Sequence, residues 1–286
     1  MAQKLKFEEK TIVPNSFYHI TIMMLYSFLE YVRSRRFFIL LLITIAIGML
    51  LTGVVAYYRP QSFLVSEQSF YANWWGETVT FIIILSAVFF GGDAISGEFQ
   101  NKTGYFLVGN PIRRSSIYLG KFLAAFCGAL IMLLVFTAMT IGNGLYYFGG
   151  VTNLFWESLS FSVLYLATAI GMTFFFSSIF KTNSTAIVVT IILMLFVFSL
   201  MQSLVANLAH YEPWFIVTYG AQIINNVLMN PYPPSTQTTA APLPHGQSIT
   251  VTSYNATVPE GLIIMMGYFI VSLVTGLILF EHKEFN

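Results

Sequence analysis

The residues best suited to bind something lie in one polar stretch, GGDAISGEFQNKTGYFLVGNPIRRSSIYLGK, residues 91–121, between two long apolar segments. Its acidic side chains come first, its basic side chains come last, and a turn-rich segment separates them. Asp93 follows a Gly-Gly pair and can cap a helix. The spacing after it predicts a short amphipathic helix with Ile95, Phe99 and Phe106 on the apolar face. The polar face is then free to bind another protein. The alternative is a solvated loop whose arginines anchor it at the membrane surface.

Residue types that support catalysis or metal binding are scattered along the chain. The histidines lie in separate loops or interfaces, and no H-E-x-x-H or other close ligand pair occurs. They are His19, His210, His245 and His282. The single cysteine, Cys127, excludes an intrachain disulfide, and the sequence has no G-x-x-x-x-G-K-[ST] phosphate loop. We therefore expect no metal, nucleotide or other cofactor in this chain.

The composition indicates an integral membrane protein. Hydrophobic residues make up 56% of the chain, charged residues only 9%, and the mean hydropathy is +0.73, which lies outside the range of soluble globular proteins. The net charge of +1 gives no sign of a nucleic-acid partner, and we expect none.

Six segments have the roughly 20 apolar residues that a helix needs to cross a bilayer. They are Phe37–Tyr58, Glu77–Gly92, Phe122–Phe148, Glu157–Phe180, Ser184–Leu208 and Gly261–Phe280. We expect the second to begin a turn earlier, at Trp74-Trp75, a pair suited to the membrane interface. The prediction is an all-α protein with six transmembrane helices and a single transmembrane domain over residues 1–286.

The basic residues predict the orientation, because cytoplasmic loops are enriched in Lys and Arg. With both termini in the cytoplasm, only Arg59 of the 13 basic residues lies outside. The others are Lys4, Lys6, Lys10, Arg33, Arg35, Arg36, Lys102, Arg113, Arg114, Lys121, Lys181 and Lys283. The sequence therefore predicts a multi-pass protein of the cell membrane, in contact with membrane lipid.

Two segments lie outside the six spans. Residues 14–36 carry apolar side chains at helical spacing and end in a basic cluster, which predicts an interfacial helix on the inner leaflet. Residues 209–260 form a long external loop between spans five and six. Within it, 214–229 is expected to be interfacial or re-entrant, and SITVTSY alternates as a short strand does. Asn255 begins a glycosylation sequon. The loop either caps an exit path or decorates the surface.

A family resemblance rests on the loop between spans two and three. Asp93 and Glu98, then Gly104, then NPIRRSSIYLGK, resemble the pattern after the second span in permeases of the ATP-binding cassette type-2 exporter superfamily. The resemblance implies that residues 93–121 form a cytoplasmic coupling loop. It implies that cytoplasmic ATPase subunits, which bind ATP and Mg, dock there, and that a second permease copy or paralogue completes the transporter. The residues it marks for ATPase coupling are Asp93, Glu98, Asn101, Lys102, Tyr105, Arg113, Arg114 and Lys121.

The function expected on this basis is export of an amphipathic substrate, which is a lipid-like molecule, a peptide or a drug. An ion-extruding permease of the same superfamily is one alternative, although no charged residue lies near the middle of a span. A channel or membrane scaffold without an ATPase is another. Polar side chains within the membrane either line a path or bond neighbouring helices. They include Thr137, Thr140, Asn143, Thr168, Thr173, Ser199, Gln202, Ser203 and Asn207.

Overall fold

The computed structural model describes residues 16–100, 113–242 and 248–283. Six helical segments within them are long and apolar enough to cross a membrane, which confirms the predicted number. They are Arg35–Tyr58, Glu67–Gln100, Arg114–Phe148, Asn153–Ile179, Asn183–Leu208 and Val258–His282. The fold is mostly helical, with one β-hairpin that the all-α prediction did not include.

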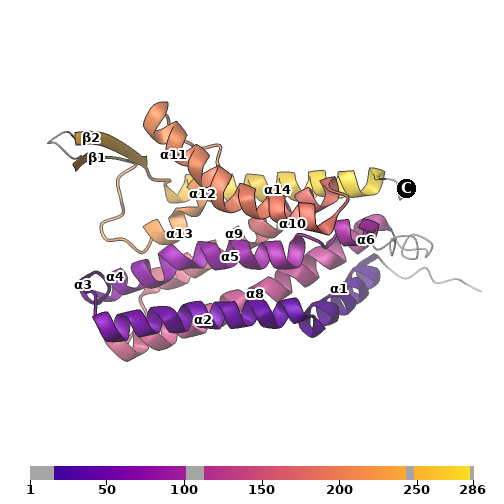
Figure 1. The fold of residues 1–286 in the computed structure, drawn as a ribbon, viewed down its shortest axis with the longest axis horizontal. Helices are drawn as coiled ribbons and strands as arrows, with labels where there is room; N and C mark the ends of the chain where they lie inside the picture. The colour runs from indigo at the N-terminus through magenta and orange to yellow at the C-terminus, as the bar shows by residue number, and fades with distance from the viewer. Residues whose placement is uncertain (1–15, 101–112, 243–247, 284–286) are drawn as a thin grey trace, which may run out of the picture.

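The six segments run along one elongated bundle (Figure 1). α5 (Glu77–Gly91) lies in the middle, with α2 (Arg35–Tyr58) and α8 (Arg114–Phe148) on one side and α14 (Val258–His282) on the other. α9 (Asn153–Ile179) packs on α5, α8 and α14. The short helix α6 (Ser96–Gln100) marks one end of the bundle, called here the α6 end, which the basic residues predict to be cytoplasmic.

The helix that precedes the first span is α1 (Ser16–Arg33), and it packs along α8. Ser34 ends it and caps α2, because its Oγ accepts a hydrogen bond from the Phe37 backbone N–H at 3.3 Å. The helix predicted over 14–36 therefore corresponds to α1, which ends at Arg33, and Arg35 and Arg36 belong to the first span. A Cβ on Gly120 of α8 would stand 2.6 Å from Met23 Cβ and 2.9 Å from the Ile20 carbonyl oxygen. Only glycine allows α1 to lie so close to α8.

The second span is longer and more irregular than expected. α4 (Glu67–Tyr71), the π-helical turn η1 (Ala72–Gly76) and α5 follow one another directly, and a turn over 92–95 leads into α6. Trp74 and Trp75 are fully buried within the protein. Trp75 stacks on Phe136, and its Nε1 donates to Ser158 Oγ at 2.9 Å. The tryptophan pair therefore packs in the core instead of facing lipid.

α8 begins at Arg114, so the last part of the stretch 93–121, predicted as a loop, is the first two turns of this helix. With 35 residues and a rise of about 1.5 Å per residue, α8 is about 50 Å long. A bilayer core of about 30 Å cannot cover it. Part of the helix therefore extends beyond the apolar layer. Its N-terminal turns lie beside α6 (Figure 1).

The fifth span also contains a π-helical turn: α10 (Asn183–Ile192), η2 (Leu193–Val197) and α11 (Phe198–Leu208) run on continuously. Two short helices, α12 (Val217–Ala221) and α13 (Ile223–Asn226), follow it. Their apolar side chains are buried against α9, α14 and η1. Residues 217–228 of the predicted interfacial or re-entrant segment are thus mostly buried, whereas Trp214, Phe215 and Met229 are exposed. The position of the segment relative to the membrane stays a prediction.

The remaining elements lie at the opposite end of the bundle, called here the α13 end (Figure 1). α3 (Gln61–Leu64) follows the first span. β1 (Thr236–Pro242) pairs antiparallel with β2 (Ser248–Tyr254), with Thr236 opposite Tyr254. β2 is the strand predicted from SITVTSY, whereas no strand was predicted over β1. Thr257 then begins α14 with a capping box to Glu260.

Candidate functional site

The turn that leads into α6 is buried and bonded to two membrane helices. The backbone N–H groups of Ile95 and Ser96 donate to Ser177 Oγ of α9 at 3.1 and 2.9 Å. The Ala94 carbonyl oxygen accepts from Lys121 Nζ of α8 at 3.1 Å. Buried backbone groups need such partners, and here they come from other helices. The turn therefore moves together with α8 and α9.

Two ion pairs flank this turn. Lys121 pairs with Glu98, and their side chains are only 11% and 14% exposed. Asp93 pairs with Arg36 at the start of α2, and Arg36 is half exposed. The family resemblance marked Asp93, Glu98 and Lys121 for ATPase coupling, but it did not identify these pairings. The geometry favours a role for Glu98 in holding α6 against α8. Its contact with an ATPase stays a prediction.

Phe99 of α6 connects the junction to the end of α14. Its ring packs edge-on against Phe280, with the centroids 6.2 Å apart. Lys283 Nζ lies 4.3 Å from the Phe99 ring centroid, within the range of a cation–π contact. Burial, together with the nearby Lys181, lowers the pKa of Lys283. The apolar side of α6 therefore faces protein.

Cationic side chains also bond the C-terminal ends of two spans. Arg114 donates to the carbonyl oxygens of Glu281 and Lys283 at 2.9 and 3.1 Å. Lys283 in turn donates to the carbonyl oxygens of Ser178 and Phe180 at 2.8 and 2.9 Å, at the end of α9. Positive charge is favourable at a helix C-terminus because it offsets the helix dipole. These bonds join the ends of α9 and α14 to the start of α8.

A further contact of this segment is made at the start of α10. Gln100 Oε1 accepts from the Asn183 backbone N–H at 2.8 Å. The five residues of α6 and the turn before it therefore contact α8, α9, α10 and α14. We call this set of contacts, with Lys121–Glu98 at its centre, the α6 junction.

The remaining predicted coupling residues divide into two groups. Arg113 is exposed just before α8. Asn101, Lys102 and Tyr105 lie outside the residues that the structure describes. A cavity of about 800 Å³ opens beside the junction, and charged side chains from α1, α2, α6 and α8 line it. It is large enough to receive a side chain or a short segment of another protein.

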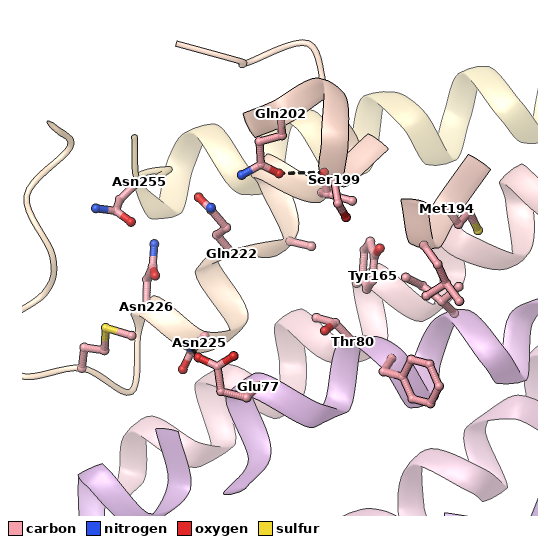
Figure 2. A pocket seen from close by; sticks show the side chains of 17 residues that line it. Glu77, Thr80, Tyr165, Met194, Ser199, Gln202, Gln222, Asn225, Asn226 and Asn255 are labelled. Carbon is pink, nitrogen blue, oxygen red and sulfur yellow. Dashed lines mark hydrogen bonds between the residues drawn. The ribbon is translucent and has the colours of Figure 1, made fainter. Parts of the chain in front are cut away.

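A second cavity, of about 460 Å³, lies toward the α13 end between α5, α9, η2, α11, α12 and α13 (Figure 2). We call it the amide cavity, because five amide side chains line it together with one carboxylate. These residues are Glu77, Gln202, Gln222, Asn225, Asn226 and Asn255. Of them, the sequence singled out only Gln202 and Asn255 as candidates. The spacing of Gln222, Asn225 and Asn226 places them on one face of a helical segment, which is the signal that could have revealed the cavity.

Other polar residues within the spans bond neighbouring backbone. Thr137 and Thr140 donate to carbonyls of their own helix, and Thr168 donates to the Met265 carbonyl oxygen of α14 at 3.0 Å. Ser199 lines the amide cavity. The contacts of these threonines favour the packing interpretation. Ser199 and Gln202 line a cavity, and the path interpretation stays a prediction for them.

The predicted glycosylation residue is engaged within the fold. Asn255 Nδ2, the atom that would carry a glycan, donates to the Pro234 carbonyl oxygen at 2.9 Å. The next two residues of the sequon are the buried Ala256 and the helix cap Thr257. Glycosylation of Asn255 stays a prediction.

The comparisons with known proteins agree with this geometry. The profile of the family described as "ABC-2 family transporter protein" matches residues 25–285. The match covers nearly the whole chain, from α1 to the end of α14. No curated protein matches the chain.

Proposed function

Because the chain belongs to the ABC-2 family of transporter proteins, we propose that it exports an amphipathic substrate across the cell membrane as the permease subunit of an ATP-binding cassette exporter. Permeases of this family are membrane subunits without an ATPase site of their own. In the proposed complex, ATP and Mg are bound by separate cytoplasmic ATPase subunits. A second copy of the chain, or a paralogue, completes the translocation path.

The α6 junction is the observation that carries this proposal. A short helix that serves only as a connection needs no contacts beyond its two flanking spans. Here α6 and its preceding turn are bonded to α8 through Lys121 and to α9 through Ser177. They also contact α10 through Gln100 and α14 through Phe99. A force on this segment would therefore displace several membrane helices together, as coupling to an ATPase requires.

The exposed surface next to the junction offers a docking site. Arg113 projects at the start of α8, close in sequence to Arg114, which holds the end of α14. An exposed guanidinium suits a carboxylate on a partner protein, because it can form two parallel hydrogen bonds. We therefore assign Arg113 to the ATPase interface and Glu98, Lys121 and Arg114 to force transmission.

The test is purification of the tagged chain from its native membranes. We expect an ATPase with a phosphate loop to purify with it, and we expect the complex, but not the chain alone, to hydrolyse ATP. Arg113→Ala should weaken this association by about tenfold, as loss of an interface arginine commonly does. Arg59→Ala is the matched control, because Arg59 is also exposed but lies at the other end of α2. ATP hydrolysis by the isolated chain, or equal effects of the two substitutions, would contradict the proposal.

A further inference from the structure

Two side-chain oxygens that line the amide cavity have no hydrogen-bond donor among the described residues. The side-chain oxygens of Gln222 and Asn225 are buried and accept no hydrogen bond within the described structure. Beside them is the carboxylate of Glu77, whose Oε1 accepts one bond, from Asn225 Nδ2 at 3.1 Å. Buried acceptors without a donor cost free energy. A ligand that brings several N–H donors would supply what they lack.

The charge of the cavity is negative. Glu77 is the only charged residue among those that line it, and no ion pair of Glu77 occurs in the described part of the chain. Figure 2 shows Glu77 and Asn225 together at the base of the hollow, with Gln222, Asn226 and Asn255 on the side away from Thr80. A carboxylate surrounded by neutral amides attracts a cation and repels an anion.

One part of the cavity lining is apolar. Phe81 and Ile84 of α5 and Met194 and Leu195 of η2 line it together with the polar groups. A ligand that fits both surfaces therefore has a charged polar end and a hydrocarbon portion. Thr80 and Tyr165 lie between the two regions (Figure 2).

Both π-helical turns of the described structure border this cavity. η1 contributes Gly76 and η2 contributes Met194 and Leu195. A Cβ on Gly76 would stand 2.1 Å from Asn225 Oδ1, so the glycine is what allows the amide to approach Glu77. Single π-helical turns interrupt regular helix bonding and are frequent at functional sites. Two such turns from separate spans, meeting at one cavity, indicate that its shape is functional.

We propose that the amide cavity binds the protonated amine of an amphipathic substrate. The ammonium group bonds the Glu77 carboxylate and the free oxygens of Gln222 and Asn225, and the hydrocarbon chain lies against Phe81 and Leu195. This inference rests on the proposed function, because the bound amine is the exported molecule only if the chain is an exporter. The remaining carboxylates of the predicted external side, with Arg59 as its only basic residue, add to the attraction for cations.

The binding test uses the isolated chain in phosphatidylcholine nanodiscs, without any ATPase. The probe is decylamine with a photoreactive diazirine on its alkyl chain, and the labelled peptides are mapped by mass spectrometry. We expect saturable labelling of the segments that contain Phe81 and Leu195. The corresponding decanol and decyl maltoside probes should label these segments weakly. Equal labelling by decanol would show simple partition into the lipid, and preferential labelling by the maltoside would show a site for polyhydroxyl groups. Either result overturns the proposal.

Variants separate binding from folding. Glu77→Gln should weaken decylamine labelling by about tenfold, the usual range for losing one charge-assisted hydrogen bond. Glu157→Gln, at an exposed glutamate that does not line the cavity, should have no effect. Gln222→Met removes a buried acceptor that lacks a donor, so it should weaken binding while the thermal stability stays equal or rises. Unchanged labelling in Glu77→Gln, or a loss equal to that in Glu157→Gln, overturns the proposal.

The outcome is distinguishable from failure of the proposed function. Because the binding assay contains no ATPase, loss of the decylamine site would leave the permease assignment intact. Conversely, a chain that binds decylamine through Glu77 but recruits no ATPase would retain this site and lose its role in ATP-driven export.

Discussion

Replacing Lys121 by methionine tests the α6 junction most directly. The change keeps the length of the side chain but removes the ammonium group. That group pairs with Glu98 and donates to the Ala94 carbonyl oxygen at 3.1 Å. Glu98 would then keep its charge in a largely buried position, with the Lys121 ammonium gone.

The expected loss follows from how far the pair is buried. Removing one partner of a fully buried ion pair costs about 3–5 kcal/mol, whereas an exposed pair contributes about 0–1 kcal/mol. With side chains 11% and 14% exposed, the pair lies near the buried limit. We expect Lys121→Met to lower the free energy of unfolding by about 3 kcal/mol. Arg36→Met should cost less than about 1 kcal/mol, because Arg36 is half exposed.

A double-mutant cycle isolates the pair. Glu98→Gln combined with Lys121→Met should destabilise the protein by about 2 kcal/mol less than the sum of the single changes, because contacting residues are not additive. The measurement is unfolding in mixed micelles with a rising fraction of sodium dodecyl sulfate, followed by tryptophan fluorescence. Strictly additive effects, or a loss in Arg36→Met as large as in Lys121→Met, would refute the reasoning.

Two further outcomes are expected. In a Cys127→Ala background, a cysteine at Asn255 should react with an impermeant thiol reagent in sealed cells and a cysteine at Lys181 should not. The reverse pattern would overturn the orientation. Gly120→Leu should lower the yield of folded protein in a fluorescence-detected size-exclusion assay, because its side chain would force α1 away from α8. Gly142→Leu on the same helix is the control, since a Cβ there meets nothing within 4 Å. Equal yields from the two variants would show that close packing of α1 on α8 is not needed for folding.

The membrane spans could be predicted from the sequence because their signal is one-dimensional. A run of apolar residues of the right length identifies a span without any knowledge of its neighbours. The ends of the spans were less predictable. Arg114 and the residues after it continue α8 beyond the apolar segment, and polar composition alone suggested a loop.

Packing decided the features that the sequence did not reveal. Trp74 and Trp75 have the composition of a membrane interface, yet Phe136 and Ser158 from other helices enclose Trp75. β1 has no clear alternation, and its pairing with β2 supplies the backbone partners that make it a strand. Partners of this kind are distant in sequence, so no local pattern shows them.

The two candidate sites also differed in how far the sequence could predict them. The α6 junction was predictable in part, because its polar residues are concentrated in one stretch. The pairing of Glu98 with Lys121 was not, since it depends on how the start of α8 lies against α6. The amide cavity draws its lining from several separate segments. Only the spacing of Gln222 and Asn225 gave a local sign of it.

The second span links the two sites physically. Glu77 at the amide cavity and Glu98 at the α6 junction belong to one helical segment, and at about 1.5 Å per residue they lie about 30 Å apart. Between them α5 is buried on most of its surface, so neighbouring helices prevent it from bending independently. The irregular turns η1 and η2 lie beside the cavity, where the walls can deform at lower cost. A displacement of α6 would therefore reach the Glu77 wall through a packed helix. In the proposed complex, an ATPase docked at the α6 end would act on the cavity without touching it.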